Sequence, residues 1–506
     1  MATLLELRSE RLRKLSELRT KGVNPYPANS QKSSDINTIV SSFEKFLDKE
    51  ASLVGRIVTL RKIGKIAFIV IRDESNKIQL FLKSENIKDA NYSESELNYS
   101  DINLLDAGDF IQASGKLIKT QTGEMSLEVK TLRILSKSLR PMPTSWDGFT
   151  NKEERLRRRY VDFNVNKEVH DRFIRRSNFW QFTREYLLNN GFVEVNVPVL
   201  EHTTGGADAN PFVTHMDALD QDFYLRISHE LPLKRLIGGG YEKVFDIGPR
   251  FRNENYTEEH LPEHVAMEWY WAYADWKDGM TFMTKMYQDV AMKTFGTQKF
   301  KIRGFDVDLS KEWEILDYGD QINKRYSIDV FNCSLDDVKR ALKENKLEVE
   351  QTDNVARGID KLWKNLRKTI AGPAWLINTP LLISPLAKVD PTRPLTVERF
   401  QPIIAGTEFG NGWSELNDPL EQLDRFKEQQ ELRKDGDKEA MMLDIDFVEM
   451  LEYGMPPTCG WGYSERVFWV LEGVTAREGV PFPQLRQEDD QVTKTIYPEL
   501  FGETKK

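Results

Sequence analysis

The spacing of hydrophobic residues changes along the chain from a helical period to strict alternation and then to a mixture of both. Residues 1–21 place leucines on a loose helical stripe that ends at Gly22. Short β-rich runs then alternate with turn signals: "LVGRIVTLRKIG", "KIAFIVIRD", "KIQLFLKS", "FIQASGKLIKT" and "EMSLEVKTLRIL". Five such runs in succession predict a small Greek-key barrel over residues 51–139.

A five-stranded barrel of this size is typical of the oligonucleotide-binding (OB) fold, which stacks bases on exposed aromatic side chains. Phe68 and Phe81 are candidates for this stacking, although a barrel phenylalanine more often belongs to the core. The net charge of −9 argues weakly against a nucleic-acid partner. The basic runs "RSERLRKLSELRTK", "ERLRRR" and "RFIRR" nevertheless predict a polarised surface that could contact phosphates.

The length of 506 residues predicts at least two domains. We expect an N-terminal helix and connector over 1–50, the barrel over 51–139, a linker over 140–170 and a second domain over 171–506. Strand and helix patterns alternate in the second domain, which predicts an α+β fold on a mainly antiparallel sheet flanked by helices. Residues from about 311 to 385 are expected to form a mostly helical insertion.

Composition narrows the class of protein. Only Cys333 and Cys459 are present, and the six histidines form no paired ligand motif, so neither a disulfide framework nor structural zinc is expected. No run approaches the roughly 18 apolar residues of a membrane span, and the N-terminus lacks the apolar core of a signal peptide. We therefore expect a cytoplasmic protein with no membrane segment.

Polar residues in the second domain follow the alternation of strands. Alternate residues of a strand share a face. In "RFRNENYTEEHLPEHVAMEWYW", Arg252 and Glu254 therefore share one face of a first strand, and Glu268 and Tyr270 share one face of a second. Taken alone, this pattern would indicate an ordinary half-exposed hairpin with cross-strand ion pairs.

Further acids change that interpretation. "GTEFGNGWSELND" adds Glu408 and Glu415, and "RISHELPLKRL" adds Glu230. Together with Glu268 these carboxylates would repel one another in a shared cavity unless cations separated them. Mg²⁺ and a substrate ammonium could supply those cations, and arginines such as Arg252 and Arg466 suit a polyphosphate. The residues predict a site for a nucleotide, a metal ion and a cationic small molecule.

Three stretches, in chain order, resemble the signature motifs of class II aminoacyl-tRNA synthetases: "GFVEVNVPVL" with Pro198, "FRNENYTEEHLPEHVAMEWY", and "GWGYSERVFWVLEG" with Arg466. With "GGADANPFVTH", "YLRISHELPLKRL", "GNGWSELND" and "LEYGMPPT", the chain resembles specifically the lysyl-tRNA synthetases over nearly its whole length. The resemblance implies an OB-fold anticodon-binding domain and a class II catalytic domain. It also implies a ligase that uses ATP and Mg²⁺ to activate L-lysine and then lysylates tRNA-Lys, acting as a homodimer whose contact includes the segment with Pro198.

The resemblance assigns roles to individual residues. It implies that the catalytic residues are Arg252, Arg466 and Glu254. ATP binding would involve Arg252, Glu254, His260, His264, Glu408 and Arg466, and Glu408 would hold Mg²⁺. The lysine-binding residues would be Gly206, Glu230, Arg252, Glu268, Tyr270, Asn411, Trp413 and Glu415. The anticodon would be read by Phe68, Gln79 and Glu124.

The chain also departs from the family's usual pattern. Gln401 stands where a second metal-binding glutamate is usual, and His264 stands where a phenylalanine usually stacks on adenine. Trp413 replaces a phenylalanine, and Glu465 replaces an aspartate after a shortened glycine run.

Two alternatives stay open. An aspartyl- or asparaginyl-tRNA synthetase shares the fold but would want a basic residue in place of Glu415. A catalytically inactive tRNA-binding paralogue would be expected to have lost Arg252 or Arg466, and both are present.

Overall fold

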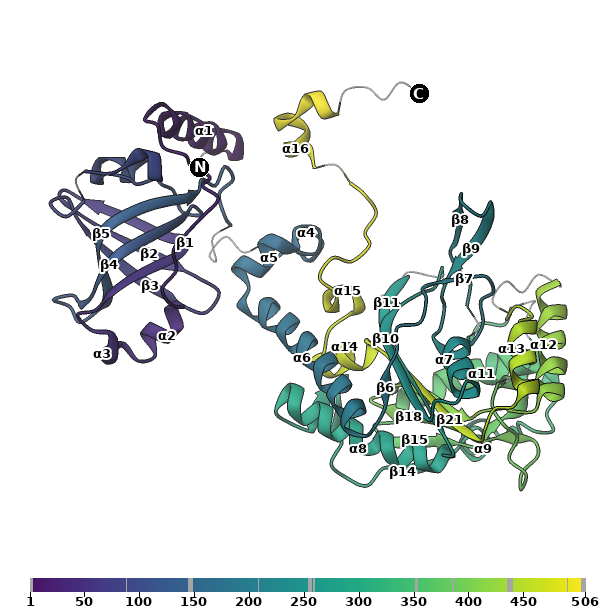
Figure 1. Cartoon of the computed structure of the whole chain (residues 1–506). Helices are drawn as coiled ribbons and strands as arrows, with labels where there is room; N and C mark the ends of the chain where they lie inside the picture. Colours follow the sequence, from purple (N-terminus) through teal and green to yellow (C-terminus); the bar gives the residue numbers. More distant parts are fainter. Residues whose placement is uncertain are drawn as a thin grey trace. The chain divides into compact units, whose positions relative to one another are not determined.

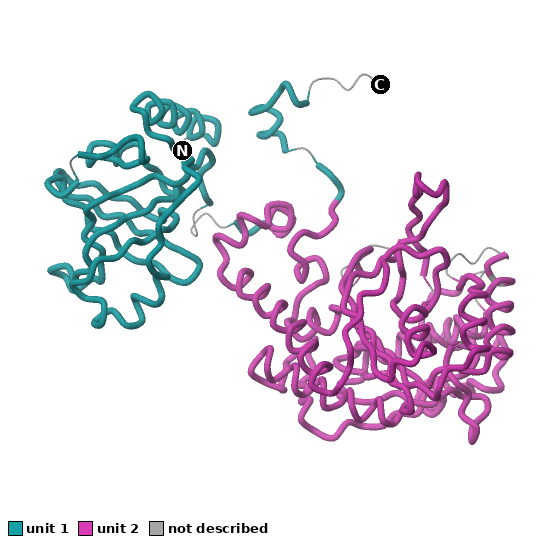
Figure 2. Tube along the Cα trace, viewed as in Figure 1, with its two compact units in different colours: residues 1–151, 486–506 teal, residues 152–485 magenta. Residues whose placement is uncertain are grey.

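The computed structural model describes residues 3–501, apart from 88, 144–148, 208, 254–256, 258–259, 351–353, 385, 435–439, 489 and the side chain of residue 432. The chain divides into two compact units, the first formed by residues 1–151 and 486–506 and the second by residues 152–485 (Figures 1 and 2). Within the described residues, no helix combines the length and apolar character needed to cross a membrane.

The first unit is built on a closed five-stranded barrel with strand order β1-β2-β3-β5-β4. Its strands are β1 (Glu50–Ile63), β2 (Ile66–Arg72), β3 (Lys77–Lys83), β4 (Phe110–Lys119) and β5 (Met125–Ser136). They coincide with the five runs identified in the sequence, so the predicted OB-fold barrel is confirmed. The shorter elements of this unit are α1 (Leu4–Thr20), α2 (Ile36–Val40), α3 (Phe43–Phe46), η1 (Tyr92–Glu94), η2 (Tyr99–Leu104), α16 (Gln491–Ile496) and η5 (Pro498–Leu500).

Alternation of side chains separates the barrel's core from its outer face. On β2 and β3 the buried residues are Ala67, Ile69, Ile71, Ile78, Leu80 and Leu82. The residues between them, including Phe68, Gln79 and Phe81, are partly exposed, because successive side chains of a strand point to opposite faces. The aromatic residues of this hairpin therefore lie on the outside of the barrel.

The second unit contains a nine-stranded sheet with strand order β14-β15-β18-β20-β21-β11-β10-β6, and β19 pairs with β18. Its strands are β6 (Val193–Glu194), β10 (Lys243–Phe251), β11 (Glu263–Ala272), β14 (Glu314–Asp317), β15 (Ala374–Ile377), β18 (Arg399–Ile404), β19 (Thr407–Glu408), β20 (Asn411–Ser414) and β21 (Thr458–Ser464). The pairings are antiparallel except β6 with β10 and β14 with β15. The predicted α+β domain on a mainly antiparallel sheet is confirmed.

Helices cover the two faces of this sheet unequally (Figure 1). The face with Trp269 and Trp461 packs against α6 (Lys167–Asn189) and α8 (Trp276–Phe295) in a large aromatic core. The opposite face is covered in part by α7 (Glu230–Gly238) and α13 (Ile445–Tyr453), which pack against Val244 and Tyr270. This partial cover leaves room for a cavity above the central strands.

The remaining elements surround the sheet. Residues 311–385 contain α9 (Tyr318–Tyr326), α10 (Leu335–Glu344) and α11 (Val355–Leu366) around their own apolar cluster, together with β14 and β15 of the sheet. The other elements are α4 (Lys152–Arg157), α5 (Arg159–Val165), β12 (Lys299–Ile302), β13 (Phe305–Asp308), η3 (Arg367–Thr369), β16 (Thr379–Pro380), η4 (Leu381–Ile383), β17 (Thr396–Val397), α12 (Pro419–Lys434), α14 (Arg466–Glu472) and α15 (Ala476–Gly479).

The segment "VEVNVPVL" begins with one short strand and ends at the start of another. Val193–Glu194 is β6, and Leu200–Glu201 is β7 of a small three-stranded sheet with β8 (Val213–Met216) and β9 (Gln221–Leu225). Pro198 lies between β6 and β7 and has no N–H to give to a strand ladder. The side chain of Arg226 instead donates to the carbonyl oxygen of Val197 at 3.0 Å.

Candidate active site

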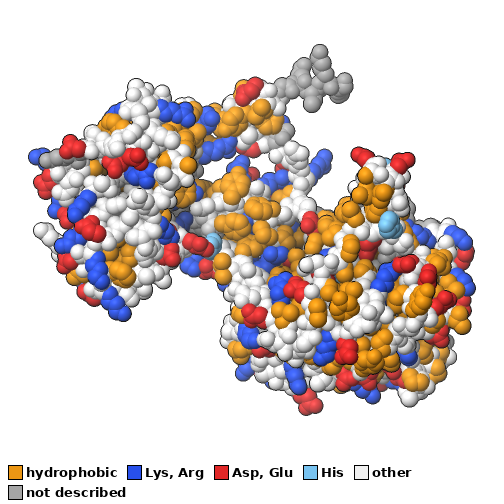
Figure 3. Space-filling view, viewed as in Figure 1, with side chains coloured by type: hydrophobic (Ala, Val, Ile, Leu, Met, Phe, Trp, Pro, Cys, Tyr) orange, Lys and Arg blue, Asp and Glu red, His pale blue; other side chains and the backbone are white. Residues whose placement is uncertain are grey.

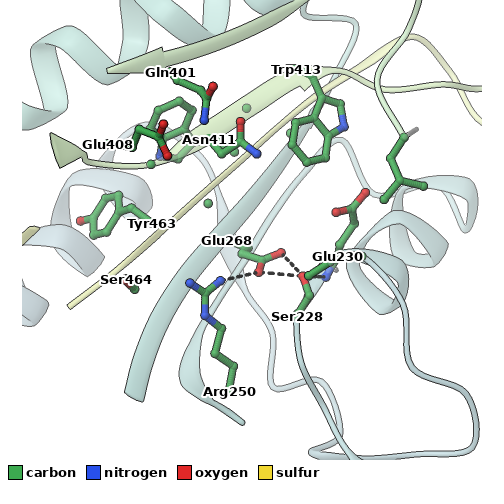
Figure 4. Close-up of a pocket in the computed structure, with 18 of the residues that line it drawn as sticks. Ser228, Glu230, Arg250, Glu268, Gln401, Glu408, Asn411, Trp413, Tyr463 and Ser464 are labelled. Atoms are coloured by element: carbon green, nitrogen blue, oxygen red, sulfur yellow. Dashed lines mark hydrogen bonds and ion pairs between the residues drawn. The ribbon is translucent and has the colours of Figure 1, made fainter. Parts of the chain in front are cut away.

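A cavity of about 410 Å³ lies over strands β10, β11, β18, β20 and β21 (Figure 4). Its lining includes eleven of the residues predicted from the sequence: Gly206, Glu230, Arg252, His260, His264, Glu268, Tyr270, Glu408, Asn411, Trp413 and Arg466. Glu415 is fully buried beside the cavity, in contact with Trp413. Glu254 lies outside the described residues, and Phe68, Gln79 and Glu124 belong to the first unit.

Strand register explains why distant parts of the chain meet here. Tyr270 of β11 and Trp413 of β20 both pair with Gly460 of β21. A Cβ atom on Gly460 would lie 2.1 Å from Glu415 Oε1 and 2.5 Å from the Tyr270 ring. A glycine is therefore needed at residue 460, because any side chain would displace the two groups that meet over it.

Glu268 projects into the cavity and is held by buried donors. Ser228 Oγ lies 2.9 and 3.1 Å from its two carboxylate oxygens, and the backbone N–H of His229 donates to it at 3.2 Å. Arg250 Nη1 lies 3.8 Å from Glu268 Oε1. These contacts fix the carboxylate before any ligand binds, which favours a charged or polar ligand group at this point.

A second group of charges lies beneath Trp413. Lys234 of α7 is fully buried, and its Nζ lies 2.9 Å from Glu230 Oε1 and 2.6 Å from Glu415 Oε2. Trp413 Nε1 donates to the same Glu415 oxygen at 2.8 Å. Lys234 therefore supplies part of the positive charge that the four acids predicted from the sequence need. Our sequence interpretation missed Lys234, although its spacing of four residues from Glu230 is a signal for an ion pair on a helix.

Burial and neighbouring charges shift the pKa values of this group. Burial raises the pKa of both Glu230 and Glu415, and Lys234 opposes that rise. Burial lowers the pKa of Lys234, but attraction to Glu230 and Glu415 outweighs it and raises that pKa to about 12. Burial, followed by repulsion from Glu230 and Glu268, raises the pKa of Tyr270 well above its ordinary value, so its phenol stays protonated and can donate.

Arginines occupy the other part of the cavity. Arg252 lies directly after the end of β10 at Phe251, one residue beyond the strand in which we expected it. Its backbone N–H donates to Pro262 O at 2.8 Å, and its Nε is buried without a hydrogen-bond partner among the described residues. Arg466, the first residue of α14, places Nη2 2.8 Å from His260 Nε2. A buried guanidinium nitrogen without a partner suits an anionic ligand.

His264 pairs across the strands with Arg250 and accepts a hydrogen bond from Arg250 Nε at Nε2, over 2.8 Å. Its Nδ1 lies 3.2 Å from the carbonyl oxygen of Leu261, which requires the proton to be on Nδ1. Burial, together with Arg250 and Arg252, lowers the pKa of His264 well below its ordinary value. His264 is therefore neutral and orients Arg250, a residue that the sequence interpretation did not include.

Glu408 and Gln401 lie at the end of the cavity formed by β18 and β19, and Figure 4 shows them there with Asn411. Glu408 Oε1 accepts from Trp363 Nε1 at 2.9 Å and lies 3.5 Å from Arg367 Nε. Asn411 Oδ1 accepts from Arg399 Nε at 2.8 Å. Across the described ranges, no group of three or more histidine, cysteine or acidic side chains could hold a metal ion. A metal at this end would therefore need oxygens from water or from a ligand as well.

The residues predicted to contact an anticodon lie on the barrel. Phe68 and Phe81 pair across β2 and β3 and stack with ring centroids 5.2 Å apart and planes 18° apart. Gln79 Nε2 donates to Ser126 Oγ at 2.9 Å, and Glu124 lies exposed in the turn before β5. The stacked rings offer a flat, partly exposed surface of the kind on which bases stack.

Comparison with known proteins agrees with this two-unit arrangement. Residues 151–486 match the family model described as tRNA synthetases class II (D, K and N), and residues 51–135 match the OB-fold nucleic acid binding domain. The chain is 39% identical over 494 residues to the "Lysine--tRNA ligase" of Fervidobacterium nodosum, covering 96% of this chain and 95% of that relative. It is 38% identical over 488 residues to the enzyme of that name from Thermotoga maritima, covering 95% of this chain and 96% of that relative. It is 39% identical over 493 residues to that of Roseiflexus sp. strain RS-1, covering 96% and 100%.

Proposed function

The chain belongs to the lysine–tRNA ligases of the class II tRNA synthetases, and we propose that its cavity activates L-lysine with ATP before transfer to tRNA-Lys. The observation that carries this proposal is the division of charge within one cavity. Glu230, Glu268 and Glu415 gather at one part of the site, and Arg252 and Arg466 line another. Acids suit the two amino groups of lysine, and arginines suit its carboxylate and the phosphates of ATP.

The first step needs no nucleophile from the protein. The lysine carboxylate attacks the α-phosphorus of ATP, lysyl-adenylate forms and pyrophosphate leaves. Arg252 would hold the carboxylate against the α-phosphate, and Arg466 would neutralise the outer phosphates. A reaction of this kind depends on alignment of the reactants and on charge neutralisation. The fixed position of Glu268, under Ser228 and the N–H of His229, supports its proposed role in aligning the substrate.

The second step joins the lysyl group to the terminal ribose of tRNA. A ribose hydroxyl attacks the acyl carbon of lysyl-adenylate, and AMP leaves. The barrel would select the tRNA by stacking an anticodon base on Phe68, with Gln79 and Glu124 nearby. The match of residues 51–135 to a nucleic-acid-binding domain and the stacked pair of Phe68 and Phe81 support this role.

The donor set at Glu408 and Gln401 fits Mg²⁺ that is also held by phosphate oxygens. One carboxylate and one amide oxygen are hard ligands, and Mg²⁺ commonly binds through one or two carboxylates plus substrate phosphates. Bound there, Mg²⁺ would neutralise phosphate charge. Gln401 brings no negative charge, so this chain would hold the ion more weakly than a pair of glutamates would.

We also propose a homodimer and a cytoplasmic location. Exposed apolar side chains lie along the small sheet of β7, β8 and β9: Leu200, Val213, Met216 and Leu219. Figure 3 shows hydrophobic side chains along the β8–β9 hairpin. An apolar surface of this kind suits burial against a second copy of the chain. Light scattering coupled to size-exclusion chromatography would test the dimer, and a monomer at micromolar concentration would contradict it.

Amino-acid-dependent ATP–pyrophosphate exchange tests the proposed activity. Lysine should support exchange, and aspartate and asparagine should not, because an acidic pocket repels a side-chain carboxylate and forms no ion pair with a neutral amide. Exchange with aspartate or asparagine would favour the alternative synthetases. No exchange with any amino acid would favour an inactive tRNA-binding paralogue.

A further inference from the structure

Lys234 occupies an unusual position for a lysine, because its side chain has no exposed area and lies beside the proposed amino-acid pocket. It bridges Glu230, one turn earlier on α7, and Glu415, which is 181 residues away on the chain. The ring of Phe447 on α13 lies 5.3 Å from its Nζ. A buried ammonium is stable here only because two carboxylates pair with it.

The bridge leaves one oxygen of Glu415 without a partner. Oε2 accepts hydrogen bonds from both Lys234 Nζ and Trp413 Nε1. Oε1 is buried and has no hydrogen-bond partner among the described residues. Oε1 points over Gly460, which lines the cavity, and lies next to the Tyr270 ring. A buried carboxylate oxygen in this state is costly unless a ligand donates to it.

We propose that Lys234 is a positioning and specificity-determining residue: as a fixed cation it holds Glu230 and Glu415 so that Glu415 Oε1 alone is presented to the side-chain ammonium of the substrate. This inference rests on the proposed function. It adds that the enzyme's own lysine neutralises one charge of the three acids, so that they do not bind a metal ion or a polyamine in place of the substrate lysine.

Charged and titratable groups from four elements face this arrangement. Glu230 comes from α7, Glu268 and Tyr270 from β11, Arg250 from β10, and Cys459 from β21. Apart from Arg250, which lies near Glu268 rather than Glu415, Lys234 is the cation among these groups. Loss of Lys234 would leave Glu230 and Glu415 facing each other and Glu268, which makes both harder to ionise.

The test compares Lys234→Met with Lys137→Met in lysine-dependent ATP–pyrophosphate exchange. Lys137 is a matched control, because it is also fully buried and paired with two acids, Asp106 and Asp109, but belongs to the barrel. Lys234→Met should raise the KM for lysine at least about tenfold with the KM for ATP nearly unchanged, as expected for one lost charged hydrogen bond. Lys137→Met should leave both constants unchanged.

The pH profile separates positioning from simple packing. In Lys234→Met, the KM for lysine should fall as pH rises from about 6 to about 8.5, because the carboxylates then ionise only at higher pH. In the unaltered enzyme the fall should be shallower, because Lys234 opposes the rise in the pKa of Glu230 and Glu415. A pH-independent KM in the variant, or equal losses for lysine and ATP, would overturn the proposal.

The unaltered enzyme keeps the proposal testable if Lys234→Met does not fold. A KM for lysine that rises about a hundredfold for each pH unit as pH falls from about 8 to about 6 would show that both acids take up a proton there, and therefore that Lys234 does not keep Glu415 ionised. Failure of the proposed function is a different result, because the unaltered enzyme would then show no lysine-dependent exchange at all.

Discussion

Glu230 and Glu268 in the cavity and Glu415 beside it each accept hydrogen bonds from buried donors, whereas Phe68 and Phe81 on the barrel stack on each other at a partly exposed surface. The cavity removes its charges from water and must therefore satisfy them within the protein, which makes it selective for a ligand that supplies the missing donor. The barrel needs no such network, because every base has a face that can stack. Under the proposed function, amino-acid selection and RNA binding therefore depend on different physics in the two units.

Substitution of an arginine in the cavity should lower the rate of ATP–pyrophosphate exchange far more than substitution of an arginine on the barrel. Arg252→Gln should lower kcat for lysine-dependent exchange by about 100-fold or more, since it removes a preorganised cation from the developing charge. Arg61→Gln, on the exposed part of β1 opposite Phe68, is the control and should leave exchange unchanged. Equal rates for the two variants would contradict the assignment of Arg252.

The next effect concerns the amino-acid end of the cavity. Glu415→Gln should lower kcat/KM for lysine by about 10- to 100-fold, because an ammonium then meets a neutral amide. The KM for ATP should change by less than about twofold, because Glu415 contacts Lys234 and Trp413 rather than the arginines. Steady-state exchange at varied lysine and ATP measures both, and parallel losses for the two substrates would argue against a lysine-specific role.

A barrel variant should show the reverse pattern. Phe68→Ala should raise the KM for tRNA in aminoacylation by about 5- to 100-fold, which corresponds to one lost base stack. Exchange, which needs no tRNA, should stay unchanged. Phe110→Ala is the matched control, because Phe110 is an exposed barrel aromatic that contacts Arg56 rather than Phe81. A similar tRNA defect in both variants would point to general damage to the barrel.

The smallest effect is expected at the end of the cavity formed by β18 and β19, where we propose that Mg²⁺ binds. Gln401→Glu adds a charge beside Glu408 and should lower the Mg²⁺ concentration that gives half-maximal exchange by about two- to tenfold. Glutamate fits the space of glutamine, but its charge is buried at residue 401, so circular dichroism should check that the variant is folded. A Mg²⁺ titration that superimposes on that of the unaltered enzyme would show that residue 401 does not contact the ion.

The barrel could be predicted almost strand by strand because its signals are local. Alternation places Ile69 and Leu80 inside and Phe68 and Gln79 outside without reference to distant residues. The cavity was predictable only in part. Alternation puts Glu268 and Tyr270 on one face of β11, and the resemblance to a known family linked them to Glu408, Asn411 and Trp413.

The remaining features of the cavity depend on contacts that no local pattern reports. His264 stands where the family usually has a phenylalanine, and only the structure shows that it accepts a hydrogen bond from Arg250, its partner across β10 and β11. Pro198, which a central strand could hardly accommodate, separates β6 from β7. In both cases the outcome is set by which strands pair and in which register.

By itself, the sequence determined the order of the motifs, the strand alternation and the chemical types of the residues, and these were enough to identify an acidic pocket next to arginines. Only the tertiary structure decided that Lys234 and Glu415, 181 residues apart, are buried together and that Gly460 leaves space for Glu415 and Tyr270 to meet. The physical reason is that periodicity is a property of neighbouring residues. The cost of burying a charge depends instead on which distant groups are buried with it.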